Sequence, residues 1–260
     1  MSASIPLPDS VYPDAPPGFS VASGQPPSEE PPSYQERSDD PDELLQPINL
    51  VLHGRFVYAA PNESSPLYEL SRVIHAQGEA TTNIEFQRLE YRVRTRPDGT
   101  PSVSQRGKHI YNISHVPILF ADECQSTLHA VSRKGLGNHL VLKKSPFPHS
   151  GHRAAIASEE EGGKGKKRPR NDYFFWVKEK KGKNEPESYQ WFNLDGKLVA
   201  THASAGIDEG QPEYVLMILE PLTRRILDGL VAFWCLWLWH EHATNTKVKK
   251  ETWKDSETAP

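Results

Sequence analysis

The chain has 260 residues, a formal net charge of −4 at neutral pH and two cysteines. This length allows one domain of ordinary size with tails. The mild negative charge gives no overall field that would attract nucleic acid, so no specific nucleic-acid partner is expected. Two cysteines are too few for a disulfide framework, and the N-terminus lacks the basic start and apolar stretch of a secretory signal, so an intracellular, cytoplasmic setting is expected.

Residues 1–46 are rich in proline, serine, aspartate and glutamate and contain few periodic apolar residues. Such a composition cannot bury enough apolar surface to offset the entropy of ordering the chain. We therefore expect a disordered N-terminal arm, followed by a folded domain that covers residues 47–243.

The arm contains Pro31-Pro32-Ser33-Tyr34, which matches the Pro-Pro-x-Tyr ligand of WW domains. Prolines favour the polyproline II helix, which docks on an aromatic groove at low entropic cost. A proline-rich tail also produces this tetrapeptide by chance, so both interpretations stay open. If the motif is functional, Pro31, Pro32 and Tyr34 bind a WW-domain protein, and the motif resembles those bound by HECT-type ubiquitin ligases.

Short strand-like segments follow the arm. Residues 48–58 read INLVLHGRFVY and predict a strand pair or bent strand around Gly54. The pairs Asp98-Gly99 and Asp195-Gly196 are strong hairpin-turn signals between such segments. Further strands are expected at residues 67–74, 84–93, 109–116, 140–143, 173–178, 190–194, 197–201 and 214–219.

A polar, low-complexity stretch at about residues 150–171 is expected to be a disordered, charged insertion between two strands. Its basic cluster consists of Lys164, Lys166, Lys167, Arg168 and Arg170. This cluster is consistent with a nuclear localisation signal or with attraction to anionic lipid. Because residues 159–161 are three glutamates that partly neutralise the cluster, a solvated loop is the favoured interpretation.

The segment from Ile226 to Trp239 is apolar on every side of a helix. A helix of this kind is either buried in a core or inserted in a membrane, and a membrane span needs about 20 apolar residues. Because this run is shorter, we expect a core helix at about residues 222–242 inside a β-barrel, with a marginal membrane anchor as the alternative. The expected core side chains are Leu230, Phe233, Trp234, Trp237 and Leu238, and residues 244–260 form a polar tail.

Residues 66–71 (PLYELS), 108–113 (KHIYNI) and 189–192 (YQWF), with the closing apolar helix, resemble the tubby C-terminal-like superfamily. This group includes LURP-one-related and scramblase-like proteins and many small uncharacterised fungal proteins. The resemblance implies a mainly β fold, a closed antiparallel barrel of about twelve strands around a hydrophobic C-terminal helix. Family members bind phosphoinositide head groups or associate with membranes, but their lipid-binding residues do not map onto this chain.

The sequence shows no arrangement of residues typical of catalysis. It has no Gly-x-Ser-x-Gly elbow and no His-Glu-x-x-His helix. The histidine pairs His149/His152 and His240/His242 lack further ligands at the spacing of a zinc site. Neither a metal nor a cofactor is therefore expected, and the chain is not expected to be an enzyme.

These features favour an intracellular, non-enzymatic binding or adaptor protein that combines a tubby-like barrel with a WW-domain ligand. The alternative is a peripheral membrane protein that binds anionic phospholipid or resembles scramblases, which leaves membrane-peripheral and nuclear locations open. A third class is an apolar-ligand carrier, which would require the helix to leave the barrel lumen.

Overall fold

The computed structural model describes residues 40–60, 64–77, 81–115, 126–133, 135–137, 139–145, 151–156, 173–180, 188–208 and 211–257. The Pro-Pro-x-Tyr motif and the basic cluster of the insertion lie outside these residues. Residues 40–46, expected at the end of the arm, belong to the described part and include a short strand, β1 (Leu44–Leu45).

Twelve antiparallel strands close into a barrel, in the order β10-β11-β12-β13-β2-β3-β4-β5-β6-β7-β8-β9. The predicted fold class is thereby confirmed. The strands are β2 (Asn49–His53), β3 (Phe56–Ala60), β4 (Tyr68–Leu70), β5 (Asn83–Thr95), β6 (Pro101–His115), β7 (Ser126–Ala130), β8 (Leu140–Lys144), β9 (His152–Ile156), β10 (Tyr173–Lys180), β11 (Ser188–Asn193), β12 (Leu198–Asp208) and β13 (Gln211–Ile218). A short 3-10 helix, η1 (Ile74–Ala76), follows β4, and β14 (Leu222–Thr223) pairs with β1.

Glycines form the turns that the sequence predicts. Gly54 lies between β2 and β3 with a φ of 59°, and Gly99 and Gly196 have φ values of 83° and 74°. A side chain with a Cβ is strained in this left-handed region, which is why Asp-Gly suits a tight hairpin. The two predicted hairpin tips, between β5 and β6 and between β11 and β12, are confirmed.

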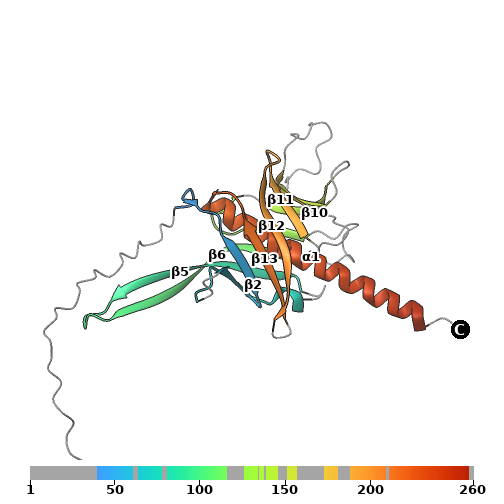
Figure 1. Ribbon diagram of the computed structural model, residues 1–260. Helices are drawn as coiled ribbons and strands as arrows, with labels where there is room; N and C mark the ends of the chain where they lie inside the picture. Colours follow the sequence, from blue (N-terminus) through green and yellow to red (C-terminus); the bar gives the residue numbers. More distant parts are fainter. Residues whose placement is uncertain are drawn as a thin grey trace, which may run out of the picture. The chain divides into compact units, whose positions relative to one another are not determined.

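The α-helix of the described part of the chain, α1 (Arg224–Glu257), runs through the barrel, as Figure 1 shows. Every residue from Leu230 to Trp239 is buried, so no face of this stretch is open to solvent. Strand side chains complete the packing: Trp191 of β11 meets the rings of Phe233 and Trp237 edge-on, with centroids 6.0 and 5.7 Å apart. The helix therefore supplies the core of the barrel.

Some elements differ from the sequence-based expectation. The helix continues to Glu257, beyond the expected end near residue 242. Strand β9 lies inside the range that the sequence assigned to the charged insertion. These residues form a strand because they pair with β8 on one side and with β10 on the other. Its short sequence, HRAAI, carries a weak strand signal, and its neighbours decide its conformation. Within the described residues, no helix has a stretch long and apolar enough to cross a bilayer.

Candidate functional site

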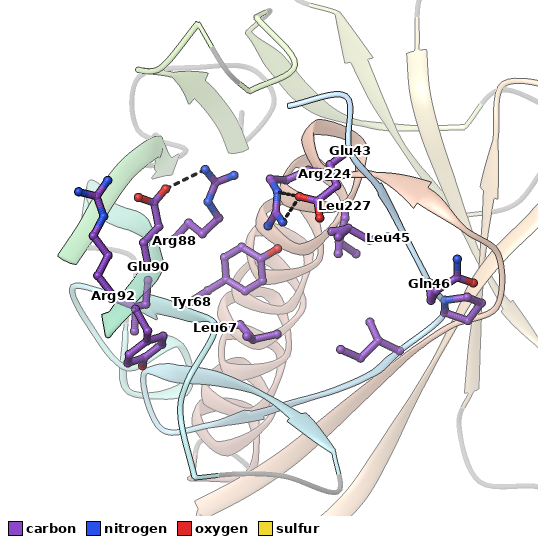
Figure 2. A pocket seen from close by; sticks show the side chains of 14 residues that line it. Glu43, Leu45, Gln46, Leu67, Tyr68, Arg88, Glu90, Arg92, Arg224 and Leu227 are labelled. Carbon is purple, nitrogen blue, oxygen red and sulfur yellow. Dashed lines mark hydrogen bonds and ion pairs between the residues drawn. The ribbon is translucent and has the colours of Figure 1, made fainter. Parts of the chain in front are cut away.

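A pocket of about 510 Å³ lies at the mouth of the barrel where α1 begins. Its walls come from the segment before β2, from the β4–β5 region and from the first turn of the helix (Figure 2). The apolar part consists of Leu45, Pro47, Ile48, Leu67, Leu89 and Leu227, and charged side chains stand at its border. The pocket is therefore amphipathic.

Residues 41–45 cap the start of the helix and form one wall of the pocket. The backbone N–H groups of Arg224 and Arg225 donate to the carbonyl oxygens of Glu43 and Pro41, at 2.8 and 3.0 Å. These are donors that a helix leaves without partners inside its own first turn. The Arg224 guanidinium also donates to the Glu43 carboxylate, with Nε 3.1 Å from Oε2. The strap of residues 41–45 is thus fixed to the helix by both backbone and side chains.

A buried polar cluster joins the pocket wall to the helix. Asp228, one turn into the helix and 1% exposed, accepts hydrogen bonds from Tyr68 Oη at 2.9 Å and from Arg88 at 2.7 Å. Arg88 also donates to Glu90 at 3.0 Å (Figure 2). The cluster ties two barrel strands to the helix, and it holds Arg88 and Glu90 at the edge of the cavity.

The electrostatics of this cluster favour a structural role. Burial raises the pKa of Asp228, and the Arg88 guanidinium and the Tyr68 hydroxyl oppose that shift. Burial, with the Asp228 charge, also raises the pKa of Tyr68 well above its usual range, so Tyr68 is a poor general base at neutral pH. Burial alone would lower the pKa of Arg88, but Asp228 and Glu90 raise it above its ordinary value, and Arg88 stays cationic.

A basic face runs along the β5–β6 hairpin from the pocket. Directly opposed residues of antiparallel strands share a face, and alternate residues continue it. The register therefore puts on one face Arg88 opposite Lys108, Glu90 opposite Arg106, Arg92 opposite Ser104, and Arg94 opposite Ser102. We call these residues the basic hairpin face: five are basic and one is acidic. Arg92, Arg94 and Arg106 are exposed, and Figure 1 shows the hairpin extending beyond the other strands.

The structure places the predicted residues as follows. The side chains Leu230, Phe233, Trp234, Trp237 and Leu238 are all buried in the lumen, at most 3% exposed. None of them lines the pocket at the helix start. Pro31, Pro32, Tyr34, Lys164, Lys166, Lys167, Arg168 and Arg170 lie outside the described residues.

Sequence reasoning missed the Tyr68, Arg88 and Asp228 cluster. The one available signal was Asp228 itself, an acidic residue within an otherwise apolar helix that must find a partner when buried. Its partners lie 160 and 140 residues away along the chain, so no local pattern identifies them.

Histidines gather where the helix leaves the barrel. The rings of His152 and His240 have centroids 5.3 Å apart, and Ser126 Oγ lies 3.1 Å from His115 Nδ1 and 3.4 Å from His240 Nδ1. His149 lies outside the described residues. Among the residues described, no three histidine, cysteine or carboxylate side chains are grouped as a metal would require.

Comparisons with family models, curated proteins and solved structures give no match. The function is therefore inferred from the pocket, the basic hairpin face and the motifs of the chain itself.

Proposed function

We propose that this protein is a non-enzymatic adaptor whose barrel binds an anionic phospholipid surface and whose N-terminal motif recruits a WW-domain protein. The observation that carries the lipid half is the position of the amphipathic pocket beside the basic hairpin face. An apolar cavity next to several cations suits an anionic amphiphile, because acyl groups and head group each find a complementary surface.

Because the lumen is filled, binding at the surface of the barrel is favoured over carriage of an apolar ligand inside it. The helix residues from Leu230 to Trp239 take the space that such a ligand would need. In the pocket at the helix start, Arg224 pairs with Glu43 and Arg88 pairs with Asp228 and Glu90, and Tyr68 has a raised pKa. A binding role fits this arrangement better than proton transfer does. The closed barrel around a helix also fits the fold that the tubby-like resemblance implies.

Liposome partitioning tests the lipid half. We expect the purified protein to bind vesicles rich in phosphatidylserine at low salt and to dissociate as salt rises, because screening weakens surface charge attraction. Arg92→Ser/Arg94→Ser should reduce partitioning roughly 30-fold, since each basic residue near such a surface contributes about 1 kcal/mol.

The matched control is Arg72→Ser/Arg133→Ser, which removes two exposed cations elsewhere and should have a smaller effect. Equal effects of both double variants would point to net charge alone and against the basic hairpin face. Neutralising Lys166, Lys167 and Arg168 in a separate variant measures how much the basic cluster of the insertion contributes to vesicle binding.

A pull-down tests the WW half. Tyr34→Ala should abolish binding to WW domains of HECT-type ubiquitin ligases without changing the melting temperature, because the tyrosine of the motif fills its own pocket on the WW domain. Tyr12→Ala, in the same proline-rich region, should leave the binding intact. Unchanged binding by the Tyr34 variant would remove the adaptor role and leave the lipid half standing alone.

A further inference from the structure

The pocket at the helix start has apolar walls that are still open to a ligand. Leu45, Ile48, Leu67 and Tyr91 are half-buried and Pro47 is exposed, so each keeps surface that a ligand can cover. The other apolar residues of the described lining are already covered within the fold. The wall formed by these five residues is therefore the part available for apolar contact.

The carboxylates of the described lining already have cations beside them. Glu43 pairs with Arg224. Glu90 lies 3.0 Å from Arg88 and 3.8 Å from Lys108 Nζ. An anionic ligand would therefore not meet an uncompensated carboxylate at this border of the pocket.

Arg92 is an available cation of the lining. Its side chain is exposed, and among the described residues no carboxylate forms an ion pair with it. Figure 2 shows Arg92 on one side of the pocket and Leu45 on the other. A guanidinium binds a carboxylate or a phosphate through two parallel hydrogen bonds. The pocket thus places an anion-binding group at the border of an apolar wall.

The volume of the pocket suits one acyl chain. About 510 Å³ holds roughly 17 groups of the size of a water molecule, at about 30 Å³ for each. Dodecanoate is close to this size, whereas a phospholipid with two long chains is several times larger. The pocket therefore has room for a single chain and its head group.

We propose that this pocket binds one single-chain amphiphile with an anionic head group, the chain against the apolar walls and the head group on Arg92. This ligand class narrows the lipid half of the proposed function, on which it rests. Each methylene group removed from water raises the affinity roughly 4-fold, so the chain supplies most of the binding. The exposed guanidinium orients the head group and selects the sign of its charge.

Isothermal titration of the full chain with dodecanoate, below the concentration at which it forms micelles, tests the proposal. We expect saturable binding of one molecule per chain. Butyrate has the same head group without the long chain and should bind at least roughly 100-fold more weakly. Dodecyltrimethylammonium has the same chain with a positive head group and should also bind more weakly. Equal binding of the two long-chain ions, or no binding of dodecanoate, would overturn the proposal.

Two neighbouring arginines of the basic hairpin face give a matched comparison. Arg92→Gln should weaken dodecanoate binding roughly 2- to 5-fold, since the pair it removes is partly exposed to water. Arg94→Gln makes the same change in net charge outside the described lining and should leave the affinity unchanged. Arg92→Glu should reverse the preference towards dodecyltrimethylammonium, which a merely loosened pocket would not do. Equal effects at residues 92 and 94 would contradict the placement of the head group.

The apolar wall has its own test. Ile48→Ala should weaken dodecanoate binding roughly 4-fold or more, because it removes apolar surface that the chain covers. Val131→Ala, at a 50% exposed valine outside the described lining, should not. Near-ultraviolet circular dichroism checks that each variant remains folded. A folded Ile48→Ala variant with unchanged affinity would count against the site.

The head group identifies the source of the ligand. Tighter binding of dodecanoate than of dodecyl phosphate indicates a fatty acid, and the reverse order indicates a phospholipid with one chain. Either order supports the site itself.

Vesicles and single molecules distinguish this site from binding to a lipid surface. Partitioning to anionic vesicles without dodecanoate binding would remove the pocket ligand and leave the surface binding in place. Dodecanoate binding that depends on Arg92, without partitioning to vesicles, would keep the pocket ligand and remove the surface binding.

Discussion

At the scale of single residues, the ion pair between Arg88 and Asp228 is buried, with side chains 7% and 1% exposed. We expect Arg88→Met to lower the free energy of unfolding by about 3–5 kcal/mol, because it leaves a carboxylate buried without its cation. Arg88→Met/Asp228→Asn should be less destabilised, since asparagine is neutral and still accepts the Tyr68 hydroxyl. Urea titration measures both variants.

The control for this prediction is an exposed ion pair. Lys197 and Glu220 lie 2.9 Å apart with side chains 58% and 35% exposed, so Lys197→Met should cost less than about 1 kcal/mol. The two residues are not coupled if the double variant at residues 88 and 228 lowers the free energy of unfolding by as much as the two single variants together.

Buried histidines make the stability of the fold depend on pH. Burial lowers the pKa of His202 and of His240 to about 4, whereas the unfolded chain takes up these protons near 6.5. The unfolded state therefore binds more protons between these values, and the free energy of unfolding should fall as pH drops from about 6.5 to about 4. Melting temperatures across this range test the prediction.

His240→Gln should flatten this pH dependence, by up to about 1.4 kcal/mol per pH unit, while changing stability little at pH 8. His139→Gln, at an exposed position, serves as the comparison. A melting temperature that stays constant between pH 6.5 and pH 4 would contradict the assignment of neutral, buried histidines.

At the scale of elements, the helix and the barrel depend on each other for a core. Trp237 is 2% exposed among aromatic side chains of the wall. Trp237→Asp should therefore unfold the domain, because it buries a charge without a partner, and Trp237→Phe should remain folded at lower stability. Circular dichroism distinguishes these outcomes, and a folded Trp237→Asp protein would mean that the helix had left the lumen.

At the scale of the whole molecule, the helix inside the barrel predicts cooperative unfolding. The buried residues Trp191, Trp234 and Trp239 report on the lumen by fluorescence, and circular dichroism reports on the backbone. We expect the two signals to share one denaturant midpoint, since neither helix nor barrel keeps its apolar surface covered alone. An earlier fluorescence transition would show that the helix separates from the strands first.

The described residues also form two pockets against the helix. Both lie between the helix and inward-facing strand residues, one where the helix enters the barrel and the other where it leaves. Such positions combine a rigid frame with access to solvent.

The sequence by itself determined the fold class, because its strongest signals are local. Continuous apolar residues from Ile226 to Trp239 require cover on every side, and Asp-Gly pairs at Asp98 and Asp195 specify tight hairpins. These patterns depend on neighbouring residues alone. Strand β9 escaped prediction because its conformation depends on pairing with both neighbours.

Only the tertiary structure decided the candidate sites. The contacts of Asp228 with Tyr68 and Arg88 join residues far apart in the chain, and so do the rings around Trp237. These groups meet because barrel closure and strand register determine which inward-facing side chains reach the helix. Local sequence patterns specify the elements, whereas the distances between elements arise from long-range pairing, which is why the sites could be recognised only in the folded chain.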